Sequence, residues 1–370
     1  MRRYQNMKHL HRFCCSVQRC NSVAARVARS LCNHTQASGS LSGSGNVELD
    51  HIPVLKQEVV SLLQPSPGKT FIDMTFGSGG HSAALLEECP DIHIIGLDRD
   101  PIAKTYAKKI QRSYQSDVEV WEGTFTEMPE LLAEHGQRLT NFADGIIFDV
   151  GASSMQFQDR RRGFGLKSKG PLDMRMGRKS NLTAADVLNK LDEKDLQRVL
   201  KRYGQEKRAR QIARAVVEHR QMMGPILTTR ELQDIVSDVY SQEDIANPQD
   251  SLGRKQHPAT LTFQALRIFV NDELNQLYNG LKIAHLLLKP KGVCVVVSFH
   301  SLEHNIAHQV FNTKHALRME TLLTPDIMHC QLFPWHCNRT VTKPSTEEIH
   351  DNPRSRSAEL RYAYKRSVIY

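Results

Sequence analysis

Three short apolar runs that each end in an aspartate constrain the fold of this chain more than any other feature. They read "FID" to Asp73, "HIIGLD" to Asp98 and "GIIFD" to Asp149, and helix-like segments separate them. Strands that alternate with helices at this interval predict a parallel sheet with helices on both faces, which is an α/β fold. Because ligands of such sheets bind beyond the carboxyl ends of the strands, we expect the three carboxylates to border one crevice.

A glycine-rich turn follows the first run, in "FIDMTFGSGGHS" (71–82). The turn lacks the lysine of a phosphate-binding loop, and Ser82 stands where a dinucleotide fingerprint has its third glycine. Asp73 would repel a pyrophosphate but suits the ammonium group of a methionine moiety. Asp98 is placed to accept hydrogen bonds from both hydroxyls of a ribose. The combination favours S-adenosylmethionine as cofactor over the nicotinamide dinucleotide of an oxidoreductase.

The first 46 residues indicate where the protein resides. They hold seven basic residues and no acidic one, and they are rich in serine. Such composition is typical of a mitochondrial presequence, although a disordered basic tail is the alternative. We expect residues 1–46 to be a presequence and flexible linker, and the mature protein to lie in the mitochondrial matrix. No stretch approaches the roughly 20 apolar residues of a membrane-spanning helix, so we expect no membrane segment.

The strand pattern stops after residue 156 and returns near residue 291. Helical spacing of apolar residues fills the interval, which ends in one expected helix over 259–288. Residues 160–230 carry 19 basic and 7 acidic residues, an excess typical of RNA binding, although a solvated face is the alternative. We therefore predict an inserted, all-helical RNA-recognition domain at 157–256. The S-adenosylmethionine-dependent methyltransferase domain would comprise 47–156 and 257–370.

The sequence resembles the bacterial-type small-subunit rRNA cytosine-N4 methyltransferases, the RsmH/MraW family. The resemblance rests on stretches in family order between residues 51 and 361, among them "FIDMTFGSGGHS", "GLDRDP", "GPLDMRM", "HPATLTFQALRIFVNDEL" and "VVSFHSLEH". It implies a Rossmann-like class I methyltransferase sheet with an inserted all-helical domain. Together with the leader, it suggests a mitochondrial member. The family commonly has "GVSSPQ" where this chain has "GASSMQ", a change that loosens the loop between cofactor and target base.

The resemblance also implies which residues contact the cofactor. By motif position these residues are Gly79, Gly80, His81, Asp98, Phe125, Asp149 and Gln156. The glycines and His81 would hold the amino-acid end of the cofactor, Asp98 its ribose, and Phe125 one face of the adenine. Asp149 and Gln156 would close the pocket near the sulfonium.

The reaction that the resemblance implies is methyl transfer to the N4 amino group of a cytidine in mitochondrial small-subunit rRNA, either free or in an assembling subunit. This amine is a poor nucleophile because its lone pair is delocalised into the ring, so catalysis depends on positioning and on proton acceptors. We expect Asp149 to accept from the amine, Ser153 to bond the base edge, and His300 to orient the base or relay its proton. A structural histidine and a purely cofactor-binding aspartate are the alternatives.

Two other functions stay open at this point. One is an rRNA-binding assembly factor with little or no catalysis, and the other is an amino-methyltransferase of another nucleic acid. Assembly factors are possible partners in either case. The pairs His329–Cys330 and His336–Cys337 offer zinc ligands, but neighbouring residues cannot easily face one ion, so we expect no metal site.

Overall fold

The structure, a computed structural model, describes residues 52–166, 169–240, 257–313, 317–318, 331–332, 335–337 and 340–366, all within one unit that spans 46–370. The expected presequence and linker at 1–46 lie outside the described residues and stay predictions. Among the described helices, none has both the length and the apolar character that crossing a membrane requires.

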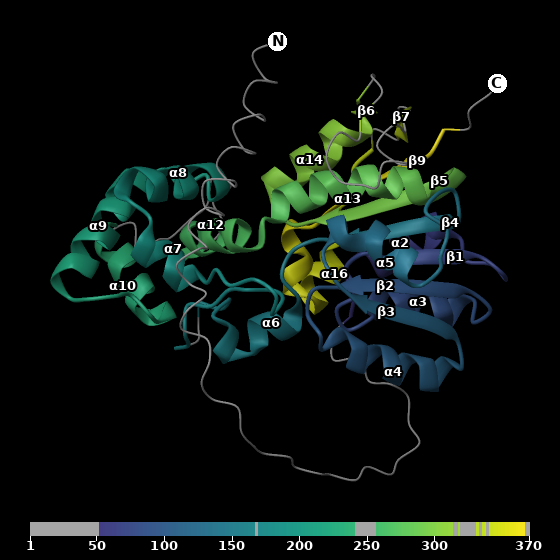
Figure 1. The fold of residues 1–370 in the computed structure, drawn as a ribbon, viewed down its shortest axis with the longest axis horizontal. Helices are drawn as coiled ribbons and strands as arrows, with labels where there is room; N and C mark the ends of the chain where they lie inside the picture. The colour runs from purple at the N-terminus through teal and green to yellow at the C-terminus, as the bar shows by residue number, and fades with distance from the viewer. Residues whose placement is uncertain are drawn as a thin grey trace, which may run out of the picture. The chain divides into compact units, whose positions relative to one another are not determined.

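In the described part of the chain, seven strands form one sheet in the order β3-β2-β1-β4-β5-β9-β8 (Figure 1). The strands β1 to β5 run parallel, β9 is antiparallel to β5, and β8 is antiparallel to β9. Their bounds are β1 Thr70–Asp73, β2 His93–Asp98, β3 Asp117–Glu122, β4 Ala143–Asp149, β5 Leu288–Ser298, β8 His336–Cys337 and β9 Glu359–Tyr364. A second, two-stranded sheet joins β6 (Leu317–Arg318) to β7 (Gln331–Leu332). The predicted Rossmann-like α/β fold is confirmed.

Helices cover both faces of the large sheet. Successive strand residues point to opposite faces, so Phe71 and Ile72, both fully buried, belong to different hydrophobic cores. One core includes residues of α2 (Lys56–Leu63), α3 (Gly80–Glu88) and α4 (Ala103–Tyr114). The other includes residues of α5 (Met128–Glu134), α13 (Glu273–Leu287) and α14 (Ser301–Phe311). Burial on both faces explains why the strand sequences read as continuous apolar runs.

The order of the strands fixes where a ligand can bind. From β1 the chain winds outward through β2 and β3, and it then returns to β4 and β5 on the other side of β1. The carboxyl ends of β1 and β4 therefore border the crevice in which doubly wound sheets bind ligands. Asp73 ends β1, Asp98 ends β2 and Asp149 ends β4, so the three acids lie along this edge.

A third hydrophobic core lies among the helices that follow the first part of the sheet. These helices are α7 (Ala184–Lys190), α8 (Glu193–Tyr203), α9 (Ala209–Met222), α10 (Thr229–Asp238) and α12 (Thr260–Asn271), and in Figure 1 they form the group at the left. Their core runs from Leu172 to Val270. It thus extends beyond residue 256, where we expected the insert to end. The division into domains stays a prediction.

The single helix expected over 259–288 is two helices. Asp272 separates α12 from α13 and adopts a left-handed conformation with φ of 50°, which an α-helix cannot continue through. As a result α12 packs in the third core, whereas α13 packs on the sheet. The chain thus passes at Asp272 from the helices of the third core to a helix that packs on the sheet.

Three short elements contribute residues to the edge of the crevice: η3 (Phe125–Glu127), α6 (Ser154–Gln158) and η5 (Pro353–Ser357). Two further short elements are η4 (Arg160–Arg162) and α16 (Thr346–Asp351).

Candidate active site

A cavity of about 650 Å³ lies at the crevice beyond the carboxyl ends of β1 and β4. Seven of the nine residues that the sequence analysis singled out line it: Gly80, His81, Asp98, Phe125, Asp149, Ser153 and Gln156. The other two, Gly79 and His300, are not in its wall. The structure thus gathers most of the expected site residues, from four different segments, around one space large enough for a cofactor and part of a substrate.

The glycine-rich turn after β1 shapes one side of the cavity. Gly79 has φ of 80° and precedes the first turn of α3, and a Cβ there would collide with Ile110 and lie 2.8 Å from the ring of Phe76. Gly79 therefore shapes the turn, while Gly80 lies in the cavity wall. Asp73 is buried beneath the turn, where it accepts hydrogen bonds from the Thr75 N–H (3.1 Å) and the Ser82 hydroxyl (2.8 Å).

His81 and Asp149 bring unpaired polar atoms to the cavity. Among the described residues, neither ring nitrogen of His81 nor Oδ1 of Asp149 has a hydrogen-bond partner. The His81 Nε2 lies 3.6 Å from Asp149 Oδ2, too far for a hydrogen bond. Burial alone would lower the pKa of His81, but the carboxylates of Asp149 and Asp73 raise it above its ordinary value. Buried polar atoms without partners are the groups that a polar ligand would satisfy.

Asp98 is poised to bind hydroxyl groups. Its carboxylate accepts hydrogen bonds from the N–H groups of Gly77 (2.7 Å) and Asp100 (2.8 Å). A carboxylate offers about four acceptor positions, so roughly two remain for a ribose. Burial raises the pKa of Asp98 to about 6, although the two backbone hydrogen bonds oppose the shift. The remaining acceptor positions of Asp98, together with the unpaired polar atoms of His81 and Asp149 in the same cavity, fit S-adenosylmethionine.

Phe125 lies three residues after the end of β3 and contacts both the core of the sheet and the cavity. Its ring meets Phe148 edge to face at a centroid distance of 5.2 Å, and it packs against the core of the sheet. It also lines the cavity. Phe125 can therefore both stabilise the core and contact a cofactor in the cavity.

Ser153 and Gln156 form a reciprocal cap at the start of α6. The Ser153 hydroxyl accepts the N–H of Gln156 (3.3 Å), and Oε1 of Gln156 accepts the N–H of Ser153 (3.1 Å). The amide nitrogen of Gln156 donates to Asp100 and to the carbonyl of Met176, both at 3.3 Å. Gln156 is thus held by protein groups, whereas the Ser153 hydroxyl donates to no group among the described residues and can donate to a ligand.

An ion pair that the sequence analysis missed, between a partly buried arginine and a buried aspartate, holds the loop after α6. Arg162, which we grouped with surface residues for RNA, donates from Nη1 to Asp100 at 2.7 Å. Its Nη2 donates to the carbonyls of Arg175 and Met176, both at 2.8 Å. Asp100 is 6% exposed. The pair ties the end of β2 to the loop that leads into the helical layer.

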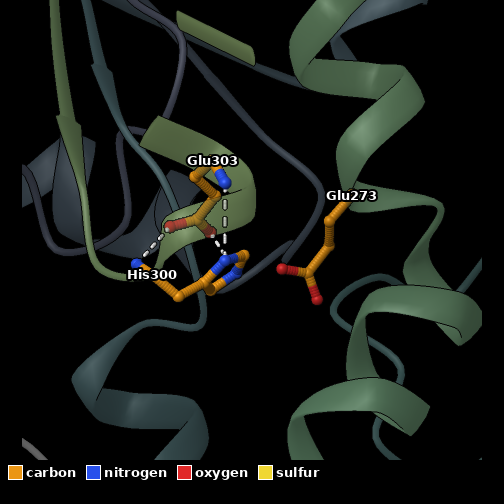
Figure 2. Close-up of side chains that lie close together, drawn as sticks. All are labelled: Glu273, His300 and Glu303. Atoms are coloured by element: carbon orange, nitrogen blue, oxygen red, sulfur yellow. Dashed lines mark hydrogen bonds and ion pairs between the residues drawn. The ribbon is translucent and has the colours of Figure 1, made fainter. Parts of the chain in front are cut away.

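His300 is absent from the cavity wall, and its ring lies against Glu303 (Figure 2). Its Nε2 lies 3.0 Å from Glu303 Oε1, and Glu303 also accepts the N–H of Phe299 at 2.8 Å. Although burial opposes it, the charges of His300 and Arg267 lower the pKa of Glu303 to about 2. Glu303, not His300, lines the cavity. The capping spacing in "HSLE" was the available signal for Glu303.

Glu273, His300 and Glu303 bring one ligand atom each to within 4.8 Å of one another, a spacing that a metal ion could use. Arg267 donates to both carboxylate oxygens of Glu273 at 2.9 Å and lies 3.9 Å from Glu303. A buried guanidinium therefore already balances these carboxylates, and we assign no metal to them.

The zinc ligands considered at the end of the chain are only partly described. His329 and Cys330 lie outside the described residues. His336 and Cys337 are consecutive residues of β8, so their side chains point to opposite faces of the strand and cannot both face one ion.

Comparison with known proteins identifies the family. The sequence model of the MraW methylase family matches residues 48–366 of the chain. The chain belongs to the MraW methylase family. The resemblance inferred from the motifs is therefore confirmed.

Three relatives illustrate the similarity. The 12S rRNA N(4)-cytidine methyltransferase METTL15 of Homo sapiens is 42% identical over 339 residues, 85% of this chain and 82% of that protein. The probable methyltransferase-like protein 15 homolog of Drosophila melanogaster is 41% identical, over 85% of this chain and 92% of that protein. The ribosomal RNA small subunit methyltransferase H of Chelativorans sp. (strain BNC1) is 40% identical, over 87% and 89%.

Proposed function

We propose that this chain transfers the methyl group of S-adenosylmethionine to the N4 amino group of a cytidine in mitochondrial small-subunit rRNA. One observation carries the proposal: the crevice of an MraW-family chain brings the carboxylate of Asp98 together with the buried, unpaired polar atoms of His81 and Asp149. The relatives named for N(4)-cytidine methylation of 12S rRNA and for methylation of small-subunit rRNA support this substrate.

S-adenosylmethionine supplies a methyl group that its positive sulfur has already activated. Asp98 would hold the ribose hydroxyls, because its carboxylate has acceptor positions left after the two backbone hydrogen bonds. His81 would bind the carboxylate of the methionine moiety, and its raised pKa favours the charged form that does so. Gly80 leaves room for close approach, and Phe125 would pack on the adenine.

Asp149 is our proposed acceptor for the amine of the target. Its N–H donates to the Thr75 hydroxyl at 2.6 Å, which anchors the residue, while Oδ1 remains unpaired in the cavity wall. A hydrogen bond from the N4 amino group to Oδ1 would localise the lone pair on the nitrogen. The carboxylate would then stabilise the positive charge that develops on the nitrogen as the bond to the methyl group forms.

Ser153 and His300 take different parts in this scheme. The Ser153 hydroxyl would donate to an acceptor on the cytosine edge, because it already accepts the N–H of Gln156. His300 has no place in the cavity wall, so we propose that it positions the turn at Phe299 through Glu303 instead of relaying a proton.

The acceptor role has a direct test. In Asp149→Asn, turnover is expected to fall by about 100-fold or more, the usual scale for a lost proton acceptor. Affinity for S-adenosylhomocysteine, measured by calorimetry, should change only a few-fold. The matched control is Asp234→Asn, an exposed aspartate of α10. Full turnover in Asp149→Asn would remove the acceptor role, and a collapse of cofactor affinity would make Asp149 a cofactor ligand only.

Exposed cations beside the cavity support RNA as the substrate. Arg160 and Arg161 lie exposed on η4, and Lys169, Arg178 and Arg354 are exposed nearby in the chain or at the cavity wall. Such cations would pair with phosphates. Because Arg162 is bound to Asp100, we expect Arg160 and Arg161 to contribute to the salt dependence of RNA binding and Arg162 not to.

The cellular setting is part of the proposal. The acid-free leader and the relatives named for 12S rRNA, a small-subunit rRNA of mitochondria, support the mitochondrial matrix and a free or assembling small subunit. Assembly factors would then be neighbours of this chain.

Mass spectrometry of nucleosides from mitochondrial small-subunit rRNA, with and without the protein, tests this function. Loss of N4-methylcytidine, restored by the wild type and by Asp234→Asn but not by Asp98→Ala, is the expected result. An unchanged nucleoside profile would favour the assembly-factor alternative.

A further inference from the structure

An aromatic ring at the edge of the cavity has no part in the contacts described so far. Phe157 of α6 is 38% exposed and lines the cavity. Its ring meets that of the buried Phe164 at a centroid distance of 6.1 Å, and the guanidinium of Arg354 lies 5.7 Å from its centroid. Arg354 belongs to η5, so two segments far apart in the chain meet at this edge.

Arg354 is available to an anion. It is exposed, it lines the cavity, and it makes no ion pair within the described part of the chain. A cation beside an exposed ring matches the two parts of a nucleotide, because the ring can stack on a base while the guanidinium pairs with a phosphate. The chemistry of the pair therefore fits an unstacked RNA nucleotide.

The position of α6 relates this ring to the proposed base-binding residues. Ser153 caps the helix, Phe157 follows four residues later, and both residues line the same cavity. The intervening loop "DVGASSMQ" from Asp149 contains no aromatic residue. Phe157 is thus the first ring that the loop after β4 offers to a base whose amino group reaches Asp149.

We propose that Phe157 and Arg354 form a clamp for the target cytidine, in which the cytosine ring stacks on Phe157 and the guanidinium binds the phosphate of the same nucleotide. This clamp rests on the proposed function, since it names the subsite that holds the methylated nucleotide. Stacking tolerates any base, so the clamp supplies affinity, while Ser153 and Asp149 read the edge of the ring.

The test measures binding separately from catalysis. A fluorescein-labelled dodecamer of cytidines is titrated by fluorescence anisotropy with protein saturated by S-adenosylhomocysteine, at several salt concentrations. Phe157→Leu is expected to weaken binding by about 5-fold or more with an unchanged salt slope, and Phe157→Trp to restore it. Arg354→Gln should weaken binding and lower the salt slope by about 0.7. Arg112→Gln, on the exposed side of α4, is the matched control for the lost charge and should leave the slope unchanged.

Each outcome decides between readings. Equal binding by wild type and Phe157→Leu, or an unchanged salt slope in Arg354→Gln, would overturn the clamp. A merely structural role of Phe157 would lower the thermal midpoint and the affinity for S-adenosylhomocysteine, which the clamp leaves intact. If the wild type methylates no RNA while Phe157→Leu still weakens dodecamer binding, the proposed methyl transfer fails and the nucleotide clamp stands. If the wild type methylates rRNA and Phe157→Leu matches it in KM, the clamp alone is wrong.

Discussion

The raised pKa of Asp98 predicts that cofactor affinity depends on pH near 6. Only the ionised carboxylate accepts hydrogen bonds from both ribose hydroxyls, and burial raises its pKa to about 6. The ionised fraction is then about 0.9 at pH 7 and about 0.1 at pH 5. Because affinity scales with the fraction of binding-competent protein, the affinity for S-adenosylhomocysteine should fall about tenfold between pH 7 and pH 5.

The assay is isothermal calorimetry with S-adenosylhomocysteine at half-unit steps from pH 5 to pH 8, for the wild type and for Asp98→Asn. The variant keeps the size of the side chain but loses its charge, so it should bind about 10- to 100-fold more weakly at pH 7.5. His81 also titrates in this cavity, but it is present in both proteins. The ratio of the two affinities therefore isolates Asp98, and a ratio that stays constant between pH 8 and pH 5 would refute the reasoning.

If the affinity fell at low pH because the protein unfolds, the stability of the folded state would also have to fall, but the titration of Asp98 has the opposite effect on stability. The pKa of Asp98 is higher in the folded protein than its ordinary 3.8, so the folded state binds this proton more tightly than the unfolded state does. The stabilisation is complete below pH 3.8 and is lost as pH rises through about 6. At pH 7 the ionised carboxylate therefore destabilises the cofactor-free protein. Asp98→Asn removes this charge, so its thermal midpoint without cofactor should not fall below that of the wild type.

Three further changes test other parts of the structure. Arg162→Gln leaves Asp100 buried without its counter-charge and should lower the free energy of unfolding by about 2–3 kcal/mol in urea titrations, whereas the neighbouring Arg161→Gln, at an exposed position, should change it by less than about 0.5 kcal/mol. Gly79→Ala strains a left-handed position and crowds the ring of Phe76, so it should cost about 2 kcal/mol or more; wild-type stability in thermal melts would contradict the crowding. Burial raises the pKa of the Cys294 thiol well above its ordinary value, so iodoacetamide at pH 8 should label it only after unfolding, as mass spectrometry would detect.

The sheet was predictable because its strands are buried on both faces and end in acids, which gives a strong local signal. The break between α12 and α13 was not, because apolar spacing continues through it. Its cause is tertiary: the side chain of Asn271 accepts the N–H of Met176 at 2.8 Å and donates to the carbonyl of Met174 at 2.7 Å. Both partners are distant in sequence, so the residues near position 272 do not by themselves indicate that the helix breaks there.

The same distinction applies to the site. The spacing of the glycine turn and of the strand-end acids made them predictable from the sequence, and the structure brings them to one cavity. The pair of Asp100 and Arg162 spans 62 residues, and each partner alone resembles a common surface charge. Sequence reasoning therefore assigned Arg162 to RNA. The placement of His300 outside the cavity wall could not be read from the sequence for a related reason, since its direction depends on the buried Glu303 one helical turn away.

The last described strand covers an edge of the sheet that would otherwise be open to pairing with another chain. β9 lies between β5 and β8, and it pairs with β5 from Val293 to Ser298, where the β5 side chains are almost entirely inaccessible to solvent. A chain that ends before residue 359 would leave β5 as a long, apolar strand with unpaired backbone groups along one edge, a template for aggregation. During synthesis this edge of β5 stays without its partner strand until residues 359–364 have been made. Truncations near the carboxyl terminus should reach the soluble fraction poorly, even though every residue around Asp98 and Asp149 is present.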